Sequence, residues 1–325
     1  MPVNLLRYPM LMIPAFKDYL WGGNTLKTKF GKKTDLPIIA ESWELSCHPN
    51  GFSIIGNGRY AGTSLAAYIE QFGSAVVGPY WDRAGKFPLL VKLIDAADKL
   101  SVQVHPGDDY AQKYCNDSGK NEMWYILDCE PGAELLLGFS EPARRDELVD
   151  RIKNNNLIDI INRVPVKIGD AFYIPAGMIH AIGKGILIAE IQQSSNATFR
   201  VYDFDRKDMN GRARELHIQS ALDVIQTDSN KNCKISQAVE QQNGFESTHL
   251  VSNDYFSVTL LNIVDEIIMQ AGPESFQAYL CLEGQAIIDH SQIQVPSAAG
   301  QTVFIPAGSG QYKIAGPAKV LLISI

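Results

Sequence analysis

The 325-residue sequence lacks the features that mark membrane and nucleic-acid-binding proteins. No apolar run reaches the roughly 20 residues that a membrane helix needs, and the N-terminus lacks the layout of a signal peptide. The net charge is −7, and Lys and Arg do not cluster into the basic surface that nucleic acids and anionic membranes require. We therefore expect neither nucleic acid nor a membrane as a partner.

Cysteine is also scarce: the chain has five, Cys47, Cys115, Cys129, Cys233 and Cys281. They are odd in number and widely spaced, and no CxxC motif occurs. This pattern predicts reduced thiols in a cytoplasmic protein. Cys47 precedes His48, but neighbours in a strand face opposite ways, which argues against a nucleophile pair.

The pattern of apolar residues is mainly that of short β-strands separated by turns. A short helix is predicted within 63–72, and two short helices are predicted as an insertion within 141–163, where apolar residues take helical spacing. The polar segment 230–244 is the best linker candidate. We expect a mainly β chain with one domain over 1–235 and a second over 236–325.

The stretch 100–125 carries polar side chains where a β core should be apolar. In a strand, Ser101, Gln103 and His105 share one face, and Lys120 and Glu122 share a face of a second strand. Burying such groups unpaired is costly, so they need a reason to be there.

A divalent metal ion is a good reason. Gln103, His105, Glu122 and a later His180 offer nitrogen and oxygen ligands suited to zinc or a similar ion. This set leaves room for water or substrate oxygens, as in a catalytic rather than a structural site. The alternative is that the histidines are hydrogen-bonded in the core and that Glu122 pairs with Lys120.

Cations accompany the predicted metal site. Lys120 should project toward it, and Arg200 and Arg206 follow the strand after His180. Together with the hydroxyl of Ser101, these cations indicate an anionic, phosphate-bearing ligand. The alternative for Arg206 is a surface salt bridge with its neighbour Asp205.

An internal repeat links the two halves of the chain. The pattern Gly169-x5-Pro175-x-Gly177-x2-His180 recurs as Gly300-x5-Pro306-x-Gly308-x2-Gln311, and Trp124-Tyr125-Ile126-Leu127 is echoed by Ala278-Tyr279-Leu280-Cys281. Two copies of one β unit predict two similar barrels. The second copy has Gln311 in place of His180 and Phe276 in place of Glu122, so we expect only the first barrel to hold metal. The other explanation, a turn sequence that recurs by chance, fits the shared spacing less well.

Several motifs carry a family resemblance. They are Ala40-Glu41-x-Trp43, His48-Pro49-x-Gly51-x-Ser53, Phe87-Pro88-Leu89-Leu90-x-Lys92, Leu100-Ser101-Val102-Gln103-Val104-His105-Pro106, Gly119-Lys120-x-Glu122-x-Trp124-Tyr125, the segment 169–180 and Arg200-Val201-Tyr202-Asp203. In this order, over residues 15–210, the chain resembles the type I phosphomannose isomerases of the short bacterial kind, in the cupin superfamily. Gln103 and Lys184 depart from the general cupin pattern, and the first departure is normal for this family.

The resemblance implies two cupin (jelly-roll β-barrel) domains, the second degenerate. It implies one zinc ion on Gln103, His105, Glu122 and His180. An essential arginine is expected at Arg200, with substrate contacts from Ser101, Lys120 and Arg206. No motif indicates the oligomeric state.

The implied reaction interconverts mannose 6-phosphate and fructose 6-phosphate through a cis-enediol. A base moves a proton between C2 and C1, the metal polarises substrate oxygens and Arg200 stabilises the developing charge. Lys120 is either the base or a phosphate ligand.

Two alternatives come from other functional classes. A metal-dependent cupin oxygenase usually has iron and a histidine-richer ligand set, which Gln103 and the neighbouring cations disfavour. Loss of metal ligands in the first barrel would favour a non-catalytic phosphosugar-binding cupin, but all four predicted ligands are present in the sequence.

Overall fold

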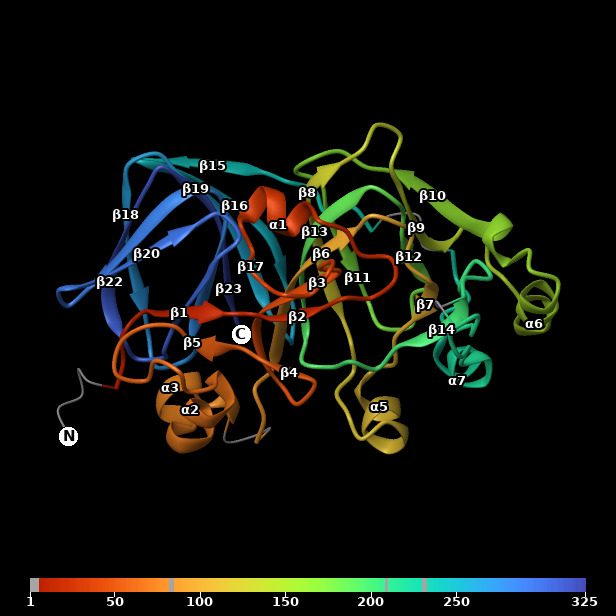
Figure 1. The fold of residues 1–325 in the computed structure, drawn as a ribbon, viewed down its shortest axis with the longest axis horizontal. Helices are drawn as coiled ribbons and strands as arrows, with labels where there is room; N and C mark the ends of the chain where they lie inside the picture. Colours follow the sequence, from red (N-terminus) through yellow and green to blue (C-terminus); the bar gives the residue numbers. More distant parts are fainter. Residues whose placement is uncertain (1–5, 82–84, 208–209, 230–232) are drawn as a thin grey trace. The chain divides into compact units, whose positions relative to one another are not determined.

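The computed structural model of the chain describes residues 6–81, 85–207, 210–229 and 233–325 (Figure 1). Strands dominate over helices, which confirms the expected mainly β class. Among these residues, no helix has the length and apolar character needed to cross a membrane.

The chain forms two compact units, each assembled from separate segments. The first unit combines Met1–Phe16, Ser42–Leu93 and Ser236–Ile325, and the second combines Lys17–Glu41 and Ile94–Ile235. N-terminal segments therefore contribute to both units. The division into domains at residues 235 and 236 stays a prediction of the sequence.

The first unit contains an antiparallel sheet of eleven strands among the described residues. Eight of them follow the order β15-β16-β17-β23-β19-β21-β1-β5, while β18 pairs with β22, and β20 and β22 pair with β19. The strands of this sheet are β1 (Met10–Ile13), β5 (Ile54–Ile55), β15 (Val239–Gln242), β16 (Phe245–Ser252), β17 (Ser257–Ile263), β18 (Glu266–Ala271), β19 (Gln277–His290), β20 (Ile293–Ala298), β21 (Thr302–Ile305), β22 (Gly310–Ala315) and β23 (Ala318–Ser324).

Among the described residues, this unit includes the short helices α2 (Leu65–Phe72) and α3 (Ser74–Val77). The helix expected within 63–72 is α2. Ser64 caps it, because its hydroxyl accepts a hydrogen bond from the backbone N–H of Ala67 at 3.1 Å, and Leu65, Tyr68 and Ile69 form its buried face.

Strand β15 lies inside the polar segment that the sequence indicated as a linker. Its four residues are exposed and pair with β16 at the edge of the sheet, so hydrogen bonding rather than burial holds them. Residues 230–232 of that segment lie outside the described residues.

Within the described residues, the second unit contains an antiparallel sheet of five strands in the order β10-β9-β12-β7-β14, and the strands β11, β8 and β13 pair in that order. The strands of this unit are β7 (Val102–Val104), β8 (Glu122–Cys129), β9 (Glu134–Phe139), β10 (Ile161–Pro165), β11 (Ala171–Ile174), β12 (His180–Ile182), β13 (Ile186–Gln193) and β14 (Phe199–Tyr202). Its helices are α1 (Thr25–Phe30), α5 (Asp108–Tyr114), α6 (Arg145–Lys153), α7 (Ile218–Val224) and the 3-10 helix η2 (Leu157–Ile160). Strands β2 (Ala15–Lys17), β3 (Glu41–His48) and β6 (Leu89–Ala96) have residues in both units, and β4 (Gly51–Phe52) pairs with β3.

Alternation along β7 divides its side chains between two environments. Val102 and Val104 pack with residues of α6 and α7 in one apolar cluster, and Figure 1 shows α7 beside β14. The side chain between them, Gln103, is left on the opposite face. The insertion expected within 141–163 is present as α6 and η2, and it supplies part of that apolar cover.

The strand register corrects the predicted correspondence between the two copies of the repeat. Ile174 pairs with Glu122 on β11 and β8, and Ile305, its counterpart in the repeat, pairs with Gln277. Gln277 therefore occupies the position of Glu122, and the assignment of Phe276 is wrong by one residue. Because side chains alternate, this slip moves a polar residue onto the inner face and turns Phe276 away.

Candidate active site

Strand pairing in the second unit aligns three of the predicted site residues. Gln103 on β7 pairs with His180 on β12 and with Arg200 on β14. Directly paired residues of adjacent strands share a face, so these three side chains form a row across the sheet. Gln103 Nε2 lies 3.4 Å from His180 Nε2, and Ser101 Oγ donates a hydrogen bond to Gln103 Oε1 at 3.2 Å.

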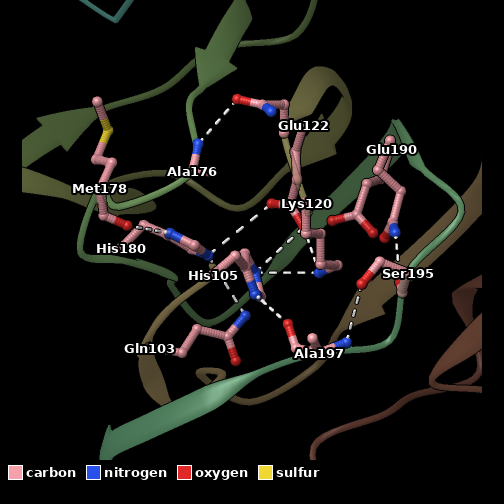
Figure 2. Close-up of polar contacts among 12 residues, drawn as sticks. Gln103, His105, Lys120, Glu122, Ala176, Met178, His180, Glu190, Ser195 and Ala197 are labelled. Atoms are coloured by element: carbon pink, nitrogen blue, oxygen red, sulfur yellow. Dashed lines mark hydrogen bonds and ion pairs between the residues drawn. The ribbon is translucent and has the colours of Figure 1, made fainter. Parts of the chain in front are cut away.

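Three ionisable side chains converge at the end of this row. The ligand-type atoms of His105, Glu122 and His180 all lie within 4.8 Å of one another, and all three residues are buried. His105 Nε2 is 3.3 Å from Glu122 Oε1, and His180 Nε2 is 3.9 Å from Glu122 Oε2. Figure 2 shows both imidazoles directed at the carboxylate.

Backbone carbonyls orient both imidazole rings. His105 Nδ1 lies 2.8 Å from the carbonyl oxygen of Ala197, and His180 Nδ1 lies 2.9 Å from that of Met178 (Figure 2). Because a carbonyl can only accept, each Nδ1 carries the proton and donates. Each Nε2 is therefore unprotonated: that of His105 can accept from Lys120 Nζ and that of His180 from Gln103 Nε2, and an unprotonated Nε2 is what a metal-binding histidine requires.

The surroundings set the charges of these groups. Burial lowers the pKa of His105 to about 3, with a further contribution from Lys120, and burial also lowers the pKa of His180. Burial alone would raise the pKa of Glu122, but Lys120 and His105 outweigh it and hold this pKa well below its usual range. Two neutral imidazoles and one carboxylate are the protonation states that bind a divalent metal.

The donor set also fits a metal on geometric grounds. Oε2 of Glu122 is buried and has no hydrogen-bond partner among the described residues. An unsatisfied buried carboxylate oxygen is costly, and a cation at this point would satisfy it. In the part of the chain that the structure describes, this is the one group of three or more His, Cys, Asp or Glu residues found with metal-ligand spacing.

Lys120 lies at this centre. Its Nζ is 3.0 Å from His105 Nε2 and forms an ion pair with Glu122 Oε1. Lys120 therefore projects as expected toward the predicted metal position, and it also makes the ion pair that was the competing interpretation of Glu122.

One predicted arginine, Arg206, and a second that was not predicted, Arg214, bind a buried carboxylate, Asp203. Arg206 Nη2 lies 2.5 Å from Asp203 Oδ1, and Arg214 binds both carboxylate oxygens at 2.6 and 2.7 Å. Burial alone would raise the pKa of Asp203, but Arg214 and Arg206 outweigh it and lower that pKa. In the part of the chain that the structure describes, Arg206 forms ion pairs with Asp203 and Asp98, and none with Asp205.

Arg200 remains available to an anion. Its Nη1 donates to the carbonyl of Glu215 at 3.2 Å, while its Nε is buried without a hydrogen-bond partner among the described residues. Arg200, Arg206 and Arg214 bring three guanidinium groups together near Asp203, and Arg206 also pairs with Asp98. A cluster of guanidinium groups suits a phosphate.

Sequence reasoning did not assign two residues of this region. Glu190 is buried on β13, paired in register with Trp124, and its Oε2 accepts a hydrogen bond from Trp124 Nε1 at 3.0 Å. The sequence offered one signal for Glu190: it lies two residues before Gln192 in a strand, so both polar side chains share a face. Arg214 lies in a loop, where no periodic pattern points to it.

The second repeat copy fills the corresponding position with hydroxyl and amide groups. Tyr312 donates a hydrogen bond to Gln277, and its hydroxyl also bonds that of Tyr279. Apolar residues surround this group. Neutral groups that satisfy one another offer a metal ion no charged ligand.

The acid dependence of stability follows from the histidines. An unfolded chain takes up protons on these imidazoles below about pH 6.5, while the folded metal-free chain keeps them neutral. The unfolded state then binds more protons, so stability should fall as pH decreases from about 6.5. Melting temperatures of metal-free protein between about pH 5 and 7.5 test this. The melting temperature should depend less steeply on pH in the variant His105→Asn than in wild type, and as steeply as in wild type in the exposed-site control His249→Asn. Equal slopes of melting temperature against pH in wild type and both variants would contradict this explanation.

Comparison with known proteins identifies relatives over nearly the whole chain. The family model for the type I phosphomannose isomerase catalytic domain matches residues 10–132, and the model for the mannose-6-phosphate isomerase cupin domain matches residues 246–325. A mannose-6-phosphate isomerase of Streptococcus mutans is 41% identical over 81% of each chain, and ManA of Bacillus subtilis is 36% identical over 97% of this chain and 98% of its own. The crystal structure of the mannose 6-phosphate isomerase from Bacillus subtilis superposes with a TM-score of 0.88 at 34% identity, covering 98% of this chain and 99% of that one. Cupin architecture, a buried two-histidine and carboxylate centre and full-length similarity agree, and the chain belongs to the type I phosphomannose isomerase family.

Proposed function

We propose that this chain is a metal-dependent aldose-ketose isomerase that interconverts mannose 6-phosphate and fructose 6-phosphate through a cis-enediol. The observation that carries the proposal is the buried convergence of His105, Glu122 and His180 beside Lys120, in a member of this family. The small-molecule partner is thus a phosphosugar. The five cysteines form no disulfide in the described part of the chain, which supports a reducing, cytoplasmic location.

Zinc is the metal that we propose, held by His105, Glu122, His180 and Gln103. Two imidazole nitrogens, a carboxylate and an amide oxygen make a set that zinc accepts. For Gln103 to bind through oxygen its amide must turn over, because Nε2 now faces His180. Ser101 would then accept from the turned amide, since a hydroxyl can donate or accept.

The bound ion would act as a Lewis acid on substrate oxygens. The residues around it supply the remaining steps. We assign Lys120 to proton transfer between C2 and C1, because its Nζ lies at the His105–Glu122 centre. We assign Arg200 to stabilising the negative oxygen of the enediolate, and Arg206 to the phosphate, with Ser101 as a further substrate contact.

Replacing Lys120 separates its two possible roles. If Lys120 transfers the proton, Lys120→Met should lower kcat by about 100-fold or more while KM changes little. Steady-state kinetics on metal-loaded protein measure this, with the exposed-site variant Lys184→Met as the control. A variant that keeps kcat and raises KM would show that Lys120 binds phosphate instead.

Isomerisation in deuterated water tests the proposed reaction. Mannose 6-phosphate should give fructose 6-phosphate that carries solvent deuterium at C1, because a proton held by a base can exchange before it returns. The rate should be the same with and without oxygen. Absence of turnover in metal-loaded protein would instead favour a phosphosugar-binding role, and turnover that requires oxygen would favour an oxygenase.

A further inference from the structure

Beside the proposed ligands lies a buried amide network that none of the roles above uses. Asn121 stands in the chain between Lys120 and Glu122 and is only 7% exposed. We propose that Asn121 is a positioning residue that fixes the spacing of the segments carrying Glu122 and His180. This inference rests on the proposed metal-binding function of that centre.

Asn121 joins two other segments of the second unit. Its Oδ1 accepts hydrogen bonds from the backbone N–H of Ala176 at 2.9 Å and from the hydroxyl of Tyr173 at 3.2 Å. Its Nδ2 and its backbone N–H both donate to Oε1 of Gln193, at 2.7 and 3.0 Å. The backbone N–H of Gln193 returns a bond to the carbonyl of Asn121 at 3.2 Å.

The direction of each hydrogen bond in this network is determined. The N–H of Ala176 can only donate, so Oδ1 of Asn121 must face it and Nδ2 must face Gln193. Gln193 then presents Nε2 to Asp108, at 3.1 Å from Oδ1, and the same carboxylate oxygen accepts from the N–H of Gly119 at 2.8 Å. Each group thus donates to the next from Ala176 through Asn121 and Gln193 to Asp108, at the start of α5.

Ala176 begins the turn that leads to His180. The next N–H, that of Gly177, donates to the carbonyl of His105 at 2.8 Å, and the carbonyl of Met178 accepts from His180 Nδ1. Figure 2 shows Ala176, Met178 and His180 along this turn. A shift of Ala176 away from Asn121 would therefore move the backbone of His105 and the carbonyl that orients His180 relative to Glu122.

Removing the amide should loosen the centre without removing a ligand. Groups that orient metal ligands through hydrogen bonds typically change metal affinity by about 10- to 100-fold when they are lost. Asn121→Ala removes the acceptor for Ala176 and the side-chain donor to Gln193 at once, and leaves only the backbone N–H as a donor to Gln193. We expect its zinc affinity to fall within that range, and the visible absorption of the cobalt(II)-loaded protein to differ from wild type, because ligand spacing is no longer fixed.

The test measures zinc affinity by competition with a chelator, the cobalt(II) spectrum and the melting temperature. Asn57→Ala is the matched control: in the first unit, Asn57 likewise accepts from a backbone N–H, that of Leu11 at 2.8 Å, and donates to a carbonyl, that of Pro9 at 3.0 Å. It should lower the melting temperature and leave zinc affinity and the cobalt spectrum unchanged.

Two further variants make the test independent of how well Asn121→Ala folds. Asp108→Ala cuts the network at its partly exposed end and should weaken zinc binding in the same direction by a smaller factor. In the pair Asn121→Ala and Gln193→Ala, the double variant should lose less affinity than the two single losses combined, because both break one network.

The inference is overturned if zinc affinity stays within about twofold of wild type in Asn121→Ala and Asp108→Ala, well below the change expected when a ligand-orienting group is lost. Strictly additive losses in the Asn121 and Gln193 pair would also contradict it. Failure of the proposed function would give a different result: wild-type protein would bind zinc tightly but would not isomerise mannose 6-phosphate. In that case the zinc affinities of wild type and Asn121→Ala still decide the role of Asn121.

Discussion

Glu122→Gln should lower kcat/KM for mannose 6-phosphate by about 1,000-fold, because a metal ion contributes several kcal/mol and each tenfold corresponds to about 1.4 kcal/mol. The substitution removes the one anionic ligand of the proposed zinc site and keeps its shape. Zinc content after gel filtration should fall in parallel with activity. Kinetics and metal analysis on the same sample measure both effects.

The same substitution should destabilise the metal-free protein. Lys120 is 4% exposed and pairs with Glu122, so the variant leaves a buried ammonium group without its counter-charge. Loss of one partner of a buried pair costs about 3–5 kcal/mol. Glu134→Gln is the control: it breaks the exposed ion pair with Arg163 and should change stability by at most about 1 kcal/mol, with full activity. Full zinc content and activity in Glu122→Gln would contradict its assignment as a ligand.

Arg200→Met should lower kcat by about 100- to 1,000-fold while zinc content stays at the wild-type level. Arg200 is in register with Gln103, and its buried Nε has no hydrogen-bond partner among the described residues, so it can reach an anion beside the metal position. Charge that develops only in the transition state affects kcat, whereas charge present in the substrate affects KM.

Arg206→Met provides the matched comparison for Arg200. Arg206 pairs with Asp203 and Asp98, and we assign it to the phosphate, which is charged before and after reaction. Its loss should raise KM with a smaller effect on kcat. If Arg200→Met changes only KM, Arg200 is a phosphate ligand and the stabilisation of the enediolate has another source.

Local sequence patterns predicted the features that depend on strand alternation. The period of two along residues 101–105 separates Gln103 and His105 from Val102 and Val104, and the structure has the same division. Mainly β structure and the helical insertion followed from similar local patterns. The meeting of His180 with Glu122 came from the repeat and the family resemblance rather than from any local pattern.

Features that depend on strand register and distant segments could not be predicted in this way. Phe276 was matched to Glu122 by aligning residues 278–281 with residues 124–127 in sequence. In the structure it is Gln277 that pairs with Ile305, so Gln277 holds the position of Glu122. Arg214 reaches Asp203 from a loop, where side-chain direction follows no period. The contacts of Asn121 join three segments whose proximity only the folded chain creates.

We propose that isomerisation requires a divalent metal bound at the His105, Glu122 and His180 centre. The decisive measurement is turnover of mannose 6-phosphate to fructose 6-phosphate before chelation, after chelation and after return of stoichiometric zinc. We expect activity to disappear with the chelator and to return with zinc in wild type, and we expect zinc to restore none of it in Glu122→Gln. Full activity in protein shown to be free of metal would contradict the requirement for a metal.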